Sequence, residues 1–126
     1  MGLIDGLMGN ATTISNNQAK TILKDVLIPD EDIQLAFVLI RDLIIFTDYR
    51  LILVNKQGVT GKKTEYKTLP YGSISRFSVE TSGHFDFDAE LKIWISGNNE
   101  PAVNLQFRRD KNINQIQQAL ALAILT

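Results

Sequence analysis

A repeat of two residues from position 33 to position 107 constrains the fold of this chain more than any other feature. A period of two places every second side chain on one face of a strand, so this stretch predicts β-structure. Turn-forming strings such as Pro70-Tyr71-Gly72-Ser73 interrupt it at short intervals. The spacing predicts seven short antiparallel strands, which is typical of a sandwich or a small barrel. The expected strands are residues 33–39, 42–47, 50–56, 63–69, 74–81, 85–95 and 103–107.

A helical period flanks the strands on both sides. Over residues 15–27, apolar residues recur at the spacing of one helix face, and Ser15 with Gln18 forms a capping-box pattern. Pro29 is expected to end this helix because proline disfavours helical backbone in the residue before it. The helical period returns near Asp110 and predicts a C-terminal helix.

Length and composition limit the classes of protein that fit. A chain of 126 residues that is 44% hydrophobic can bury a core without disulfides. We predict an N-terminal helical segment over residues 1–30 and a β-rich domain over residues 31–126. The absence of cysteine removes thiolate chemistry and fits a reducing cytoplasm. A net charge of −1 gives no strong field toward nucleic acid, and no apolar run approaches the roughly 20 residues of a transmembrane helix.

Two long strings of residues resemble a known family. FTDYRLILVNKQGVTGKKTEYKTLPYGSISRFSVETSG and its continuation HFDFDAELKIWISG resemble the small bacterial pleckstrin-homology-like (PH-like) proteins, a domain of unknown function. The resemblance extends from about residue 22 to about residue 120, nearly the whole chain. It implies a PH-like seven-stranded barrel or sandwich capped by a C-terminal helix, a cytoplasmic location and self-assembly into rings. It brings no enzymatic activity, cofactor or settled ligand.

The loop after the third strand is a candidate anion site. Lys56, Lys62 and Lys63 accompany Gly58 and Gly61, a composition similar to a phosphate-binding loop. That motif needs wider glycine spacing, a Ser or Thr after the lysine and a following helix, and all three are missing here. Two alternatives follow: the three lysines make a weak contact with an anionic lipid or phosphorylated ligand, or the loop is a solvated turn.

Three carboxylates also share one strand face. Asp86, Asp88 and Glu90 alternate along the sixth strand, but the pattern of a calcium loop is missing. The favoured interpretation is a polar sheet face with cross-strand partners such as Lys92, Arg76 or Lys67.

Two single residues complete the candidates for chemistry. His84 is the only histidine and has no partner pattern for catalysis, so we predict no catalytic, cofactor or metal site. Trp94, on the polar face of its strand, either packs on its neighbours or anchors an interface.

Both faces of the first three strands are apolar, although a half-exposed strand needs only one apolar face. Ile33, Leu35 and Phe37 are expected to share one face of the first strand. The second face must be covered by the N-terminal helix or by another chain, and we predict a homo-oligomer with cyclic symmetry. The candidate contacts are Ala36, Val38, Ile40, Ile44 and Phe46. The sequence therefore predicts a non-catalytic binding and assembly module that recruits a protein or peptide partner.

Overall fold

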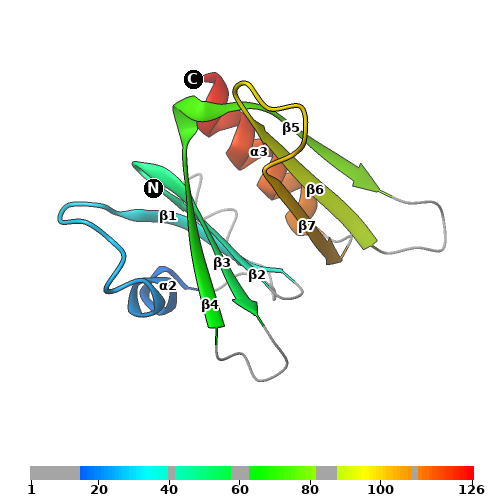
Figure 1. The fold of residues 1–126 in the computed structure, drawn as a ribbon. Coiled ribbons are helices and arrows are strands. Elements are labelled where there is room, and N and C mark those ends of the chain that lie inside the picture. Colours follow the sequence, from blue (N-terminus) through cyan, green and yellow to red (C-terminus); the bar gives the residue numbers. More distant parts are fainter. Residues whose placement is uncertain (1–14, 40–41, 58–62, 82–87, 109–110) are drawn as a thin grey trace. The chain divides into compact units, whose positions relative to one another are not determined.

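The computed structural model describes residues 15–39, 42–57, 63–81, 88–108 and 111–126 (Figure 1). It contains helix α2 (Asn16–Ile22), seven strands in two antiparallel sheets and helix α3 (Lys111–Leu125). The predicted mainly-β class and the order of elements are confirmed, and the two sheets do not close into one barrel. The strands are β1 (Ile33–Val38), β2 (Asp42–Thr47), β3 (Arg50–Gln57), β4 (Lys63–Pro70), β5 (Ile74–Thr81), β6 (Asp88–Ile95) and β7 (Val103–Arg108), with the 3-10 turn η1 (Tyr71–Ser73) before β5.

The described residues divide into two compact units, each considered by itself. The first unit ends at Thr68 and contains α2 and the sheet β1-β2-β3-β4. The second unit begins at Leu69 and contains η1, the sheet β5-β6-β7 and α3. Neither described helix is long and apolar enough to cross a membrane.

Helix α2 begins as its sequence predicts and ends earlier. The Ser15 hydroxyl accepts a hydrogen bond from the Gln18 amide at 3.1 Å. The Gln18 side-chain oxygen accepts one in return from the Ser15 amide, also at 3.1 Å. This capping box satisfies amide groups that the first helical turn leaves without partners. The α-helix ends at Ile22, before the predicted end at residue 27, and the chain continues as turns through Val26.

A β-bulge at the start of β1 changes the face on which Ile33 lies. Ile33 pairs with Thr47 and Leu35 pairs with Phe46, so β1 has one extra residue between these two pairs. An extra residue interrupts the alternation of side chains along a strand. Ile33 therefore packs in the same cluster as Ala36, and the prediction that it shares a face with Leu35 is wrong.

Helix α2 covers one face of the first sheet. Ala19 of the helix and Leu23, which caps its C-terminal end, are fully buried in one cluster with Ala36 and Ile45. Ala36 lies opposite Ile45, and Ile45 lies opposite Ile52, so these three side chains line one face of the sheet. The N-terminal helix is thus the cover for this apolar face within the chain.

The opposite face of the first sheet is buried as well. Its side chains are between 0% and 5% exposed. The rings of Phe37 and Phe46 meet edge to face with their centroids 6.4 Å apart, a favoured aromatic geometry. The face consists of Leu35, Phe37, Ile44, Phe46, Leu51 and Leu53.

The second sheet has one apolar face and one polar face. Leu91 and Ile93 of the central strand β6 are fully buried, and their partners across the sheet include Val79 and Leu105. Helix α3 contacts β5 and η1 within this unit. The other face, here called the β5–β7 polar face, consists of Arg76, Ser78, Glu80, Glu90, Lys92, Trp94, Asn104 and Gln106.

Candidate functional site

The predicted lysine site falls largely outside the described residues. Lys62 is outside them, and Lys56 belongs to β3 without a described side chain. Lys63 begins β4 and its side chain is exposed. The anion contact through these three lysines therefore stays a prediction.

The predicted oligomer contacts do not share one surface. Ala36 and Val38 lie on the face of the first sheet that α2 packs against, whereas Ile44 and Phe46 lie on the opposite face. Ile40 lies outside the described residues. Within this chain Ala36, Ile44 and Phe46 are at most 3% exposed, and Val38 keeps 38%. One interface cannot use all five side chains, while self-association itself stays a prediction.

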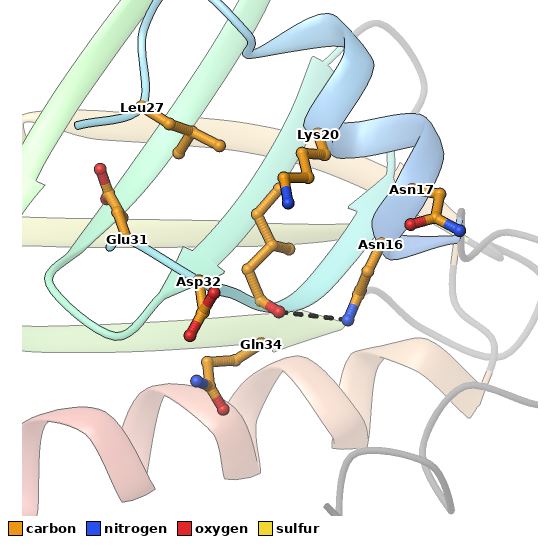
Figure 2. A pocket seen from close by; sticks show the side chains of 8 residues that line it. Asn16, Asn17, Lys20, Leu27, Glu31, Asp32 and Gln34 are labelled. Atoms are coloured by element: carbon orange, nitrogen blue, oxygen red, sulfur yellow. Dashed lines mark hydrogen bonds between the residues drawn. The ribbon is translucent and has the colours of Figure 1, made fainter. Parts of the chain in front are cut away.

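A pocket of about 260 Å³ lies beside α2 and the start of β1 (Figure 2). The side-chain amide of Asn16 donates a 3.1 Å hydrogen bond to the carbonyl of Ile33, which ties the helix to the strand at the pocket wall. Sequence patterns did not indicate this pocket, because its lining residues follow no motif spacing. The lining residues are Asn16, Asn17, Lys20, Leu27, Glu31, Asp32, Ile33 and Gln34.

The pocket's chemistry suits a small polar molecule. Lys20 from α2 and Asp32 from the segment before β1 bring opposite charges, and neither makes a salt bridge with another described residue. Side-chain amides supply further donors and acceptors. Across the described part of the chain, no group of three or more His, Cys, Asp or Glu side chains is placed to hold a metal ion.

Glu31, one of the residues that line this pocket, forms a buried ion pair with Arg50. The Arg50 Nε atom is 2.9 Å from Glu31 Oε2, and Arg50 Nη2 is 2.9 Å from Glu31 Oε1. The Glu31 side chain is 0% exposed and that of Arg50 is 19% exposed. Thr47 Oγ1 donates to Glu31 Oε2 at 2.6 Å, and the Ile28 amide donates to Glu31 Oε1 at 3.1 Å. Each carboxylate oxygen therefore accepts two hydrogen bonds, which offsets the cost of burying the charge.

Arg50 also joins segments that are distant in sequence. Its Nη2 atom donates to the carbonyl of Val26, and its Nη1 atom donates to the hydroxyl of Thr68, both at 2.9 Å. The guanidinium thus connects the segment after α2, the strand β3 and the strand β4. Such a network stabilises the first unit and fixes one wall of the pocket.

The electrostatics of the pair favour permanent ionisation. Hydrogen bonding to Arg50 lowers the pKa of Glu31 from 4.5 to about 2, against the raising effect of burial and with help from Thr47 and Ile28. The same hydrogen bond raises the pKa of Arg50. Glu31 therefore stays charged at physiological pH and serves as a structural anchor instead of a proton donor.

The β5–β7 polar face carries a second arrangement of charged groups. The Arg76 guanidinium carbon lies 4.5 Å from the centroid of the Trp94 ring. Lys92 pairs with Glu90 at 3.3 Å, so Glu90 belongs to a polar sheet face as interpreted, but both residues lie on β6 and the prediction of Lys92 as a cross-strand partner is wrong. Asp86 lies outside the described residues, and the side chain of Asp88 is not described. Trp94 packs on a neighbouring strand, as one of its two predicted roles requires.

Comparison with known proteins decides the family. A family model described as Bacterial PH domain matches residues 2–124. The chain belongs to the bacterial PH domain family. Two similar proteins come from Bacillus subtilis (strain 168), and both are uncharacterized. YjqA is 60% identical over 121 residues, which cover 96% of this chain and 97% of YjqA. YozO is 28% identical over 113 residues, which cover 90% of this chain and 95% of YozO.

Solved structures confirm the PH-like fold of this bacterial PH domain. A pleckstrin homology domain from Shewanella amazonensis SB2B has a TM-score of 0.83 at 46% identity, covering 99% of this chain and 100% of that one. A DUF1696 family protein with a pleckstrin-homology domain from Shewanella loihica PV-4 has a TM-score of 0.72 at 42% identity, and the match covers 92% of this chain and 98% of that one. A PH domain containing protein from Exiguobacterium sibiricum 255-15 has a TM-score of 0.64 at 20% identity, and the match covers 90% of this chain and 60% of that one. This similarity shows the fold alone.

Proposed function

We propose that this bacterial PH domain is a non-catalytic binding and assembly module that forms homo-oligomers in the cytoplasm and recruits a protein or peptide partner. The PH-like fold supports a non-catalytic role, because domains of this fold are typically non-catalytic. The exposed edge of strand β4 is the observation that carries self-association and the recruitment of a partner.

Most side chains of strand β4 are exposed. It ends the strand order of the first sheet, so among the described strands it pairs with β3 alone. Seven of its eight side chains are exposed, and only Leu69 is buried. An edge strand presents backbone N–H and C=O groups that another strand can pair with. A long edge strand with exposed side chains on both faces is therefore a ready acceptor for a strand from another copy or from a peptide.

The side chains of β4 make this pairing selective. Lys63, Glu65 and Lys67 place charges of both signs along the strand. Charged residues on an edge oppose indiscriminate association, because an incoming strand with like charges opposite them is repelled. A partner strand must therefore match the charge order as well as the backbone register.

Two adjacent proline substitutions test this use of β4. Neighbouring N–H groups of a strand point to opposite edges, so Glu65→Pro and Tyr66→Pro remove one N–H that faces β3 and one that faces away from it. We expect one variant to lose assembly in light scattering while its thermal unfolding temperature stays near that of the parent protein. The other variant should be destabilised. If both variants keep the parent's molar mass, β4 is not the contact.

The alternative prediction is weak binding of an anionic lipid or phosphorylated ligand through Lys56, Lys62 and Lys63. The described residues add no support to it, because Lys63 is the only one of the three with a described side chain.

A further inference from the structure

The Arg76–Trp94 pair is a preorganised group on the β5–β7 polar face. Arg76 of β5 lies directly opposite Trp94 of β6, and the guanidinium stacks on the indole at 4.5 Å (Figure 1 shows the two strands side by side). The indole Nε1–H donates a 3.2 Å hydrogen bond to the carbonyl of Asn99, which fixes the ring. The Ser75 hydroxyl donates to the Trp94 carbonyl at 3.3 Å. The Trp94 ring is therefore held in place beneath Arg76 before anything binds.

Arg76 has no carboxylate partner within the described part of the chain. Its side chain is exposed and forms no salt bridge with a described residue. Glu90 on the same face is paired with Lys92 at 3.3 Å. Glu80 lies four residues further along β5, about 13 Å away at the rise of a strand. The guanidinium lies over the face of the indole, and an arginine carries five N–H donors that can bind an acceptor.

The charges on this face are arranged by position. The end that holds Arg76 and Trp94 is positive, and the other end places Glu80 directly opposite Glu90. Ser78, Asn104 and Gln106 between and beside them are uncharged hydrogen-bonding groups. A binding partner that fits this order brings an acidic group to the Arg76 end.

We propose that Arg76, stacked on Trp94, anchors a carboxylate in an acidic segment of a partner protein. The inference rests on the proposed function as a module that recruits a protein or peptide, and it names the chemistry of that partner. A guanidinium binds a carboxylate with two parallel hydrogen bonds, and the stack lowers the entropy lost on binding. Arginine and tryptophan are also the residues enriched where interfaces derive most of their affinity.

A carboxylate fits this site better than an anionic membrane surface does. Among the residues of this face whose side chains are described, Arg76 and Lys92 are the cations, and Lys92 is already paired. Attraction to an anionic membrane grows by only about 1 kcal/mol for each cation near its surface. A face with charges of both signs does not give that attraction, whereas Arg76 alone is enough to anchor one carboxylate.

Peptide selection followed by fluorescence tests the proposal. A random dodecapeptide phage library is selected on the immobilised full-length protein, and the enriched sequences are synthesised. Trp94 is the only tryptophan of the chain, so its emission reports on this site directly. We expect the enriched peptides to contain Asp or Glu and to change Trp94 emission in a saturable way. Arg76→Gln should weaken their binding about tenfold or more, the usual loss for a hydrogen bond to a charged group.

Two further variants make the result specific. Arg76→Lys keeps the charge without the planar two-pronged geometry and should weaken binding by less than Arg76→Gln does. Lys24→Gln removes one exposed charge from the turn after α2, in the other unit, and should leave the affinity unchanged. Circular dichroism and thermal unfolding verify that each variant is folded.

The outcomes separate this inference from the proposed function. Enriched peptides without acidic residues, or acidic peptides that bind Arg76→Gln as tightly as the parent protein, would overturn the inference while recruitment of peptides stands. Failure to enrich any peptide would overturn both the inference and peptide recruitment. Self-association is measured by light scattering without any peptide, so its failure would leave the Arg76 result intact.

Discussion

The two sheets of this bacterial PH domain use their second faces in different ways. In the first sheet both faces are apolar and buried, one of them beneath Ala19 of α2 and its C-cap Leu23. In the second sheet one face is apolar and the other carries charged and amide groups. Both sheets are antiparallel and built from strands of six to eight residues. The comparison indicates that the first sheet is committed to stability, and that the second leaves a face available for binding.

The salt bridges of the two units also differ in how deeply they are buried. Glu31–Arg50 in the first unit has a carboxylate that is 0% exposed, whereas both members of Glu90–Lys92 in the second unit are 30% exposed. Solvent weakens an exposed pair, and removing one partner of a buried pair leaves a charge without compensation. A pair of similar length thus has a structural role in one unit and little energetic role in the other.

Breaking each salt bridge in turn tests this difference and has the largest expected effect. Glu31→Gln should lower the free energy of unfolding by about 3–5 kcal/mol, because Arg50 loses its buried counter-charge. Glu90→Gln, the same chemical change on the second sheet, should cost about 1 kcal/mol or less. Urea denaturation at one fixed protein concentration measures both. Equal losses would contradict the contrast between the two units.

Truncating one apolar side chain at each helix compares a buried position with an exposed one. Leu23→Ala should cost about 2–5 kcal/mol, because Leu23 is fully buried in the cluster beneath α2. Leu122→Ala in α3 should change stability by about 0.5 kcal/mol or less, since Leu122 is 50% exposed. The same denaturation experiment measures the two variants. A small loss for Leu23→Ala would mean that α2 does not act as the cover of the first sheet.

The ion pair of the first unit should also make stability depend on pH in acid. The pKa of Glu31 falls from 4.5 to about 2 in the folded chain. A lowered carboxyl pKa contributes stability above its ordinary value, and that stability is lost as the pH falls through the folded pKa. The advantage of the parent protein over Glu31→Gln should therefore be full at pH 6 and decline between about pH 4.5 and pH 2. Denaturation curves for both proteins at pH 6, 4 and 2.5 measure it, and a constant difference would refute the assignment.

The smallest of these effects concerns the start of α2. Ser15→Ala removes the hydroxyl that accepts from the Gln18 amide and should cost about 1 kcal/mol. Ser78→Ala removes a hydroxyl from an exposed position of the β5–β7 polar face and should change stability by about 0.5 kcal/mol or less. Thermal unfolding of the two variants ranks them. A larger loss for Ser78→Ala would mean that the polar face is part of the stabilising structure.

Local patterns were sufficient for most of the fold. The period of two located all seven strands to within a few residues, because alternation follows directly from strand geometry. The capping box at Ser15 and Gln18 was also readable, since both of its hydrogen bonds join residues three positions apart. The bulge at the start of β1 could not be predicted from the sequence, because an extra residue is defined only by the pairing of β1 with β2. Ile33 was therefore assigned to the wrong face.

The pocket and its anchor required tertiary information. Glu31 and Arg50 lie 19 residues apart and belong to no motif, so their ion pair could not be inferred from spacing. The early end of α2 has the same origin, since the turns after Ile22 bring the Val26 carbonyl within reach of Arg50. The predicted oligomer contacts mixed Ala36 with Ile44 because faces were counted strand by strand, without the register that relates one strand to the next.

Self-association is the central claim of this account, and the molar mass of the parent protein tests it most directly. Size-exclusion chromatography with light scattering over a hundredfold dilution series gives that mass at each concentration. The account predicts a mass that is an integer multiple of the 14.1 kDa chain and at least twice that value at the higher concentrations. A mass of one chain at every concentration would contradict it.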